Sequence, residues 1–192
     1  MKVTLLRVTE DPEGLVASSA RICYASEPKT LEANVKLLRN LRSWGHLSMF
    51  EHACATFLVE GVSRACTHQL VRHRIASYSQ QSQRYVNEEG FEYVTPPTVT
   101  ERPGAKKAFD EAVEASRVAY KRLIEAGIPK EDARFLLPNA TATKIVVTMN
   151  FRELRHFIKL RGAKDAQWEI RQLAMEMLRL LKEMAPNAFD DL

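Results

Sequence analysis

The densest run of hydrogen-bonding side chains in the chain lies in residues 68–85. These eighteen residues include three arginines, two histidines, four glutamines and three serines, but no Glu, Lys or Gly. Amides and hydroxyls beside arginines suit the edge of a base and a phosphate, because a guanidinium offers paired donors in one plane. The alternative is a helix C-terminus whose arginines complement the dipole, followed by a polar edge strand. The residues alone leave both interpretations open.

Arg161 is the second position that could do chemistry. With a 3.6-residue period it continues an apolar stripe formed by Phe151, Leu154, Phe157 and Ile158. The opposite side of this segment carries Arg152, Arg155, His156 and Lys159. A guanidinium in line with an apolar stripe needs a partner, because burying an unpaired charge is costly. That partner is a ligand or an internal carboxylate, unless Arg161 simply caps the last carbonyls of the helix.

Arg134 has a similar setting, on a short predicted helix beside Phe135 and Leu136. It either contacts a ligand or forms a structural salt bridge with Glu131, three residues earlier. His46 and His52 flank a polar segment, but no histidine–carboxylate spacing repeats, so we predict no metal site.

Familiar nucleotide-binding loops are absent from the sequence. The seven glycines are scattered and form no G-x-G pair, which excludes a dinucleotide-binding turn and a phosphate-binding loop. Any nucleotide must be held by side chains and helix ends. Cys23, Cys54 and Cys66 form no C-x-x-C, so we expect neither disulfides nor zinc, and we interpret each cysteine as a core residue.

Length and charge set the broad class. The chain has 192 residues, which favours one domain over residues 1–192, and a net charge of +4, too small to argue for nucleic-acid binding. No apolar run approaches the ~20 residues that span a bilayer, and the first residues do not resemble a signal peptide. We therefore expect a cytoplasmic protein that binds neither nucleic acid nor membrane.

Predicted helices and strands alternate irregularly along the chain. We expect strands at residues 2–8, 53–59 and 144–149, and a hairpin whose polar half covers 77–86 and whose returning half covers 91–94. We expect helices at 11–24, 30–44, 62–73, 103–126, 129–137, 150–161 and 165–183. Asn150 and Glu153 form a predicted capping box. Strict βαβ alternation is missing, so the expected fold is α+β, with a central, mainly antiparallel sheet flanked by helices.

The polar run resembles the signature of a known enzyme family. Arg72, His73 and Arg74, then seven residues, then Ser82, is similar to the R-H-R-x7-S pattern of flavin-dependent thymidylate synthases. Further similarity extends in the family's order over Gly45-His46, Phe50-Glu51-His52, Ala133-Arg134, Leu137-Pro138, Asn150-Phe151-Arg152, Leu160-Arg161 and Ala166-Gln167-Trp168-Glu169.

The resemblance implies an activity and an assembly. It implies a homotetramer that binds FAD tightly, with active sites where subunits meet. It also implies reductive methylation of dUMP to dTMP, with 5,10-methylenetetrahydrofolate as carbon donor and NADPH as reductant.

The resemblance also implies site residues. Those matching flavin contacts are Ser48, Arg72, His73, Arg74, Gln80, Asn150, Phe151, Arg152 and His156. Those matching dUMP contacts are Gln69, Leu70, Val71, Arg72, Gln80, Gln81, Ser82, Gln83, Arg84, Arg134 and Arg161. Some members have Glu where this chain has Gln80 and Asn where it has His156. Both replacements can still form hydrogen bonds.

Arg161 is the predicted catalytic residue. Uracil C5 is a poor nucleophile, and no cysteine lies in the site-like segments to activate it by addition. We expect Arg161 to stabilise negative charge on the N3/O2 edge of the ring, an effect of about 2.7–4 kcal/mol per donor. No histidine–carboxylate relay is evident beside Ser82, so we expect Ser82 to position the nucleotide rather than attack it.

Two rival classes remain at this stage. In a nucleic-acid-binding module, the arginines would contact phosphate while Tyr78 and Tyr85 stack on bases. A structural relative without activity is the other, although the intact set of arginines speaks against it.

The absence of a suitably placed cysteine generates a prediction. Cys54→Ala and Cys66→Ala should both retain dTMP formation, because neither thiol is expected to add to the uracil ring. Product formation by each purified variant is compared with the wild type. A folded variant that is inactive would contradict the prediction.

Overall fold

The computed structural model describes residues 1–27 and 30–192 and has an α+β fold. Its mainly antiparallel sheet has the strand order β1-β2-β4-β3. The strands are β1 (Lys2–Val8), β2 (Cys54–Ser63), β3 (Ala76–Gln80) and β4 (Ala142–Asn150). The Thr56 hydroxyl bonds the Thr148 hydroxyl across β2 and β4. Glu60, four residues after Thr56, pairs with Lys144, four residues before Thr148, so these two strands run antiparallel.

The residues group into two compact units. Unit 1 comprises Met1–Lys2, Glu60–His68 and Ser79–Ile145, and unit 2 comprises Val3–Val59, Gln69–Tyr78 and Val146–Leu192. Strands β2 and β4 contribute residues to both units. That residues 1–192 form one domain stays a prediction.

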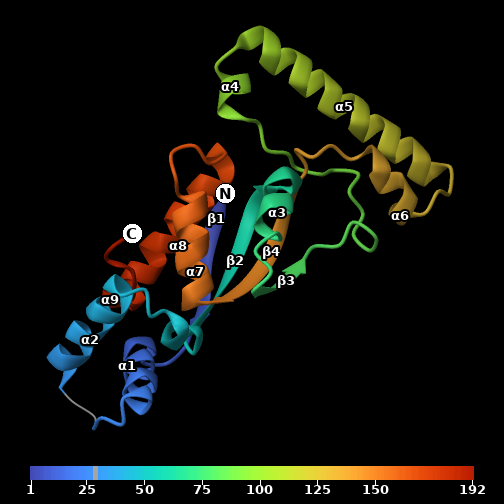
Figure 1. Cartoon of the computed structure of the whole chain (residues 1–192). Helices are drawn as coiled ribbons and strands as arrows, with labels where there is room; N and C mark the ends of the chain where they lie inside the picture. The colour runs from blue at the N-terminus through green and yellow to red at the C-terminus, as the bar shows by residue number, and fades with distance from the viewer. Residues whose placement is uncertain (28–29) are drawn as a thin grey trace. The chain divides into compact units, whose positions relative to one another are not determined.

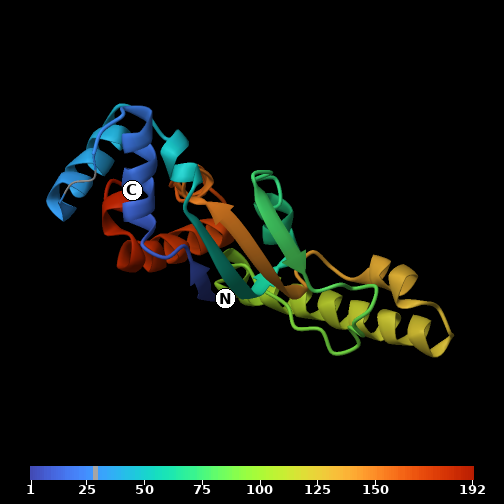
Figure 2. The ribbon, with the colours of Figure 1, turned by 90° about the horizontal axis from the view of Figure 1, so that it is seen from below.

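Unit 2 is built from helices around the N-terminal strand. They are α1 (Pro12–Cys23), α2 (Leu31–Ser43), the 3-10 helix η1 (Ser48–Glu51), α7 (Phe151–Arg161), α8 (Trp168–Met184) and α9 (Pro186–Phe189). Helices α7 and α8 pack side by side (Figure 1), and α1 lies against α2 (Figure 2). Buried aromatic side chains, among them Phe50, Phe151 and Phe157, form much of its core.

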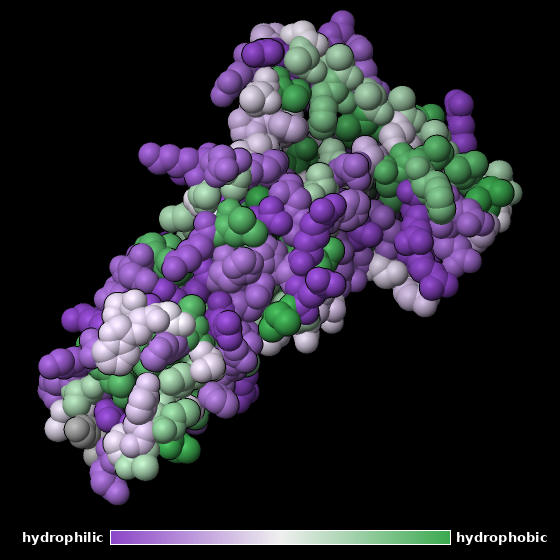
Figure 3. Space-filling model, viewed as in Figure 1, coloured by the Kyte–Doolittle hydropathy of each residue, from purple (hydrophilic) through white to green (hydrophobic). Residues whose placement is uncertain are grey.

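Unit 1 carries most of α3 (Arg64–Leu70) and a long helix with short companions. These are α4 (Pro97–Thr100), α5 (Pro103–Glu125), α6 (Lys130–Ala133) and the 3-10 helix η2 (Arg134–Leu136). Gly127 follows α5 with φ 81°, a left-handed conformation that favours glycine and ends the helix. Apolar side chains remain exposed here (Figure 3), notably Phe135, which is 83% exposed, and Val118.

Most predicted elements are confirmed. The strand at 2–8 and the helices that begin after Asp11, Thr30 and Asn150 are present, and in each of these helices the side chain of the named residue caps the N-terminus. The predicted last helix begins later, at Trp168, because Gln167 caps it. The short elements η1, α4 and α9 were not predicted.

Two predictions about the middle of the chain are wrong. The helix expected at 62–73 covers only Arg64–Leu70, because β2 extends to Ser63 and its pairing outweighs local helix preference. The hairpin expected between 77–86 and 91–94 does not form. Residues 92–94 pair instead with residues 140–142, through the Tyr93–Thr141 bridge, while the backbone N–H of Gln81 donates to the carbonyl of Lys144 in β4.

Two side chains are placed differently from expectation. Cys23 is exposed rather than in the core, whereas Cys66 is buried and Cys54 is half-buried. Arg155, expected on the polar side of its helix, is only 2% exposed. Its guanidinium donates to the carboxylate of Asp191 at 2.6 and 2.8 Å and to the carbonyl of Ala188, so a C-terminal segment supplies partners for this buried charge.

No helix in the described part of the chain is long and apolar enough to cross a membrane.

The Arg155–Asp191 pair makes stability depend on pH. Burial alone would raise the pKa of the Asp191 carboxyl, but hydrogen bonds and charge from Arg155, with help from Arg42, lower that pKa to about 2. A lowered pKa in the folded state stabilises the fold above the unfolded pKa of about 3.9, and this contribution disappears as pH falls through the folded pKa.

Asp191→Asn should therefore lower the free energy of unfolding at pH 7 by about 1–3 kcal/mol, because Arg155 loses its charged partner. The difference from the wild type should shrink as pH falls from about 4 to about 2. Urea denaturation across this range measures it, with the exposed Asp165→Asn as control. A difference that does not change with pH would contradict the assignment.

Candidate active site

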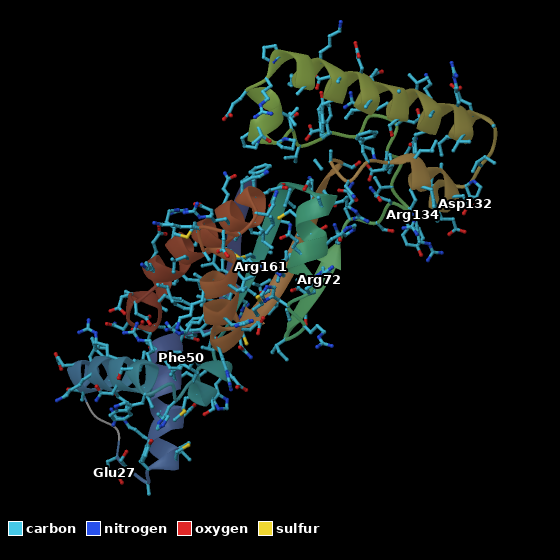
Figure 4. All side chains as sticks on the ribbon, turned by 45° about the horizontal axis from the view of Figure 1, so that its top comes forward. Glu27, Phe50, Arg72, Asp132, Arg134 and Arg161 are labelled. Atoms are coloured by element: carbon cyan, nitrogen blue, oxygen red, sulfur yellow. The ribbon has the colours of Figure 1, made fainter. Side chains whose placement is uncertain are left out.

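Arg161 and His73 are joined by a hydrogen bond in unit 2. Arg161, half-buried at the C-terminal end of α7, donates its Nε–H to Nε2 of His73 at 3.1 Å. Figure 4 labels Arg161 together with Arg72, which follows α3. The predicted need for a partner is therefore met by a histidine, and Arg161 does not act mainly as a carbonyl cap. Among the described residues, no protein group bonds its two Nη atoms.

The histidine ring is held in place from several sides. His73 is only 5% exposed, and its Nδ1 lies 2.9 Å from a carboxylate oxygen of Glu153. The ring of Phe157 meets it edge to face, with centroids 5.0 Å apart. The hydroxyl of Tyr78, on β3, lies 2.8 Å from the carbonyls of both His73 and Leu70. Ring and backbone are thus both fixed.

The surroundings of His73 favour its neutral form. Burial lowers its pKa below the ordinary histidine value, and the charges of Arg161 and His156 lower it further, while the hydrogen bond and charge of Glu153 oppose these effects. Burial also raises the pKa of Tyr78, and the charge of Glu153 adds to this, so the phenol keeps its proton.

The capping box predicted at the start of α7 forms only in part. Asn150 Oδ1 accepts from the Glu153 backbone N–H at 2.8 Å, as predicted. The Glu153 carboxylate does not return to the Asn150 backbone, because it bonds His73 instead. The residue predicted as a cap is therefore part of the polar cluster.

A cavity of about 540 Å³ lies beside this cluster in unit 2. Its lining consists of Leu47, Glu51, Ile75, Asn150, Arg152, Glu153, Arg155, His156 and Lys159. Three residues predicted to hold flavin, Asn150, Arg152 and His156, are thus brought together. The guanidinium of Arg152 lies 2.5 Å from Glu51, a partner that sequence reasoning had not identified.

The other residues predicted for unit 2 have mixed settings. Arg72, Arg74 and Ser48 are exposed, as is Val71, while Gln69 is half-buried. Leu70 and Phe151 are fully buried, and the Phe151 backbone N–H already donates to Ala53. Their side chains belong to the core, so any contact with a ligand would involve other atoms.

Unit 1 holds the second half of the polar run. Gln80 donates its amide to the hydroxyl of Thr67 at 3.0 Å, and Gln81 donates to Glu88 at 3.3 Å. Glu88 is buried, and burial raises its pKa despite the hydrogen bond from Gln81 and the charge of Arg64. Gln81 and Glu88 line a cavity of about 380 Å³.

Two arginines of unit 1 converge on Glu131. Arg84 binds its carboxylate through Nε and Nη2, at 3.0 and 2.9 Å, and Arg134 donates to its backbone carbonyl at 3.1 Å. The salt bridge considered between Arg134 and Glu131 is therefore wrong, because Arg84 takes that carboxylate. Figure 4 labels Arg134 on this short helical segment. Two guanidinium groups near one carboxylate leave donors for an anion.

Two further predicted residues lie in the turn after β3. Ser82 Oγ accepts from the backbone N–H of Arg84 at 3.2 Å, whereas the side chain of Gln83 is buried. That Ser82 positions the nucleotide stays a prediction.

Metal binding would conflict with the Arg161 contact. Among the described residues, His73, Glu153 and His156 place ligand-type atoms within 4.8 Å of one another. However, both ring nitrogens of His73 already have partners, and a cation there would oppose the charge of Arg161. The cluster is better suited to orienting a guanidinium.

Sequence reasoning missed the roles of Glu153, Glu51 and Tyr78. A glutamate at the third position of a helix is common in a capping box, so its place in the sequence offered no reason to assign Glu153 to a site. Its contact with His73 joins residues eighty positions apart and has no local sequence signal.

Comparison with known proteins identifies relatives over most of the chain. Residues 4–187 match the family model described as thymidylate synthase complementing protein. A relative from Geobacter sulfurreducens is 52% identical, over all of this chain and 86% of its own length. Relatives from Pyrococcus abyssi and Mycobacteroides abscessus are 46% and 44% identical, over 93% and 92% of this chain and 78% of each relative.

All three relatives are enzymes that share one name, flavin-dependent thymidylate synthase. The chain belongs to this family of flavin-dependent thymidylate synthases, as its match to the family model over nearly its whole length shows.

Proposed function

We propose that this protein methylates dUMP reductively to dTMP, with FAD as bound cofactor, 5,10-methylenetetrahydrofolate as carbon donor and NADPH as reductant. Family membership supports thymidylate synthesis with a flavin. The observation that carries the proposal is the half-buried guanidinium of Arg161, whose Nε–H donates to His73.

Arg161 is proposed as the catalytic residue. Its two Nη groups provide a planar pair of donors, which match the O2 and N3 lone pairs of a uracil ring that has released its N3 proton to solvent. As negative charge develops on that edge, these donors stabilise it, and electron density at C5 rises. The residue needs no reorganisation for this, because His73 already holds it.

The cavity beside α7 fits a flavin cofactor, which supplies the redox chemistry when bound. Its volume of about 540 Å³ and its apolar side chains suit a ring system, and its basic side chains, which outnumber the acidic Glu51 and Glu153, suit an anionic diphosphate. We assign flavin contacts to Ser48, Arg72, His73, Arg74, Gln80, Asn150, Phe151, Arg152 and His156. Asn150, Arg152 and His156 line the cavity, whereas Phe151 could contribute only backbone atoms.

The nucleotide is proposed to be held by the remaining predicted residues. Arg84 and Arg134, which converge on Glu131, suit its phosphate, because guanidinium groups bind phosphate oxygens in pairs. The full proposed set is Gln69, Leu70, Val71, Arg72, Gln80, Gln81, Ser82, Gln83, Arg84, Arg134 and Arg161.

No cysteine nucleophile is proposed. Cys23 is exposed on α1 and Cys66 is buried on α3. Burial raises the pKa of the Cys54 thiol, which disfavours the reactive thiolate.

A homotetramer with active sites at subunit interfaces is also proposed. Family membership supports it, as do the exposed apolar side chains Phe135, Val118 and Ile128 of unit 1.

The proposal predicts that the purified protein is yellow, with an absorbance maximum at about 450 nm from its bound flavin. It should form dTMP from dUMP, methylenetetrahydrofolate and NADPH, and light scattering should give the mass of a tetramer. A colourless protein that takes up no FAD but binds RNA with strong salt dependence would overturn the proposal.

Arg161→Ala should retain FAD absorbance but lose dTMP formation by about 10²–10³-fold in kcat, the usual effect of removing one charge-stabilising donor. Arg161→Lys serves as the matched control, since it keeps the charge without the planar fork and should recover only part of the turnover. Wild-type turnover in the alanine variant would exclude the role.

A further inference from the structure

Glu153, His73 and Arg161 form a chain of two hydrogen bonds inside unit 2. Glu153 Oε1 lies 2.9 Å from His73 Nδ1, and Arg161 Nε lies 3.1 Å from His73 Nε2. Both bonds lie within the normal range for nitrogen donors. Glu153 and Arg161 stand near opposite ends of α7, so His73 bridges positions two turns apart on that helix.

The chemistry of arginine fixes the direction of both bonds. A guanidinium has donors and no acceptor, so Nε2 of His73 must accept the hydrogen bond from the Nε–H of Arg161. In a neutral imidazole the other nitrogen then carries the proton, and Nδ1–H donates to the Glu153 carboxylate. The opposite tautomer, or a protonated ring, would place an N–H of His73 against the N–H of Arg161.

We propose that Glu153 is a positioning residue that fixes the tautomer of His73, so that His73 holds Arg161 by its Nε–H and leaves both Nη groups for the substrate. The inference rests on the proposed function of Arg161. Nothing in the family signature assigns this role to Glu153, which sequence analysis explained as a helix cap.

Burial shows why such a residue is needed. The side chain of Glu153 is 12% exposed and that of His73 is 4% exposed, so water does not readily replace their bond. Without the carboxylate, only the contact with Arg161 would favour the Nδ1–H tautomer, so the other tautomer, which cannot accept from Arg161, would be populated more. An acceptor at Nδ1 stabilises the tautomer that binds Arg161.

Protonation of His73 would break the same arrangement. The charged and titratable groups facing this ring are Glu153, His156 and Arg161 from α7 and Tyr78 from β3. Burial, Arg161 and His156 lower the pKa of His73, whereas Glu153 raises it. Activity should therefore fall on acidification as His73 gains a proton, and removing Glu153 should move this acid limb to lower pH.

The test compares the flavin-loaded wild type with Glu153→Ala and Glu153→Gln. In Glu153→Ala, kcat for dTMP should fall by about 10- to 100-fold, the usual effect of removing a residue that orients another, while FAD absorbance and the KM for dUMP change little. Glu153→Gln should regain most of the turnover, because its amide oxygen can accept from Nδ1–H. The acid limb of kcat/KM should move to lower pH in both variants.

Glu32→Ala is the matched control. Glu32 is an exposed glutamate in the first turn of α2, so its removal reproduces the loss of a charge near a helix N-terminus. This variant should keep wild-type kcat and the wild-type acid limb.

Nitrogen NMR of the full chain with ¹⁵N-labelled histidine provides a readout besides activity. Wild-type His73 should be protonated at Nδ1 and not at Nε2, and Glu153→Ala should shift it toward a mixture of tautomers. A wild-type proton on Nε2, or wild-type kcat in a folded Glu153→Ala, would overturn the inference. If the alanine variant does not fold, wild-type pH dependence in Glu153→Gln would overturn it. A wild type that forms no dTMP would refute the proposed function instead, while the nitrogen spectra still test the tautomer.

Discussion

The hydrogen bond from Arg161 to His73 is the constraint on which the rest of the site depends. A guanidinium only donates, so the bond exists only while the imidazole is neutral and presents a lone pair at Nε2. Burial, the edge of Phe157 and the hydroxyl of Tyr78 all keep His73 in one place. Glu153 then selects which nitrogen carries the proton. The guanidinium of Arg161 is thereby oriented at the C-terminal end of α7, and the neutral ring that holds it does not neutralise its positive charge.

Helix α7 shows two opposite uses of arginine. Arg155 is buried and bonded to a carboxylate and a carbonyl of the C-terminal segment, so its charge serves stability. Arg161, six residues later, bonds to a neutral ring and keeps its charge available. In unit 1, Arg84 stands between these two cases. Its guanidinium is exposed and paired with Glu131, a partner that an anionic ligand can replace. The partner of each arginine, rather than its position on a helix, separates structure from function.

Local sequence patterns correctly predicted the helices whose N-termini have a capping side chain. Asp11, Thr30 and Asn150 cap helices that begin where expected, because capping depends on bonds within one turn. Prediction failed where distant strands decide the pairing. Residues 92–94 pair with residues 140–142, and β2 continues to Ser63. A local window of sequence contains neither pairing partner, so it could not predict these contacts. Arg155 was misplaced for the same reason, since its partner is Asp191.

The sequence by itself determined the α+β class, most helices and the family resemblance, because spacing and residue type carry that information. Only the tertiary structure decided what Arg161 contacts. An internal carboxylate was one of the expected partners, but the protein group that Arg161 contacts is the ring of His73, with the carboxylate of Glu153 one bond further away. Which atoms donate and which accept in the Glu153–His73–Arg161 hydrogen bonds follows from contacts between residues eighty or more positions apart in the sequence. A periodic sequence pattern does not reveal such contacts. The polar run that marked the site therefore gained its chemical meaning only when folding set His73 between Glu153 and Arg161.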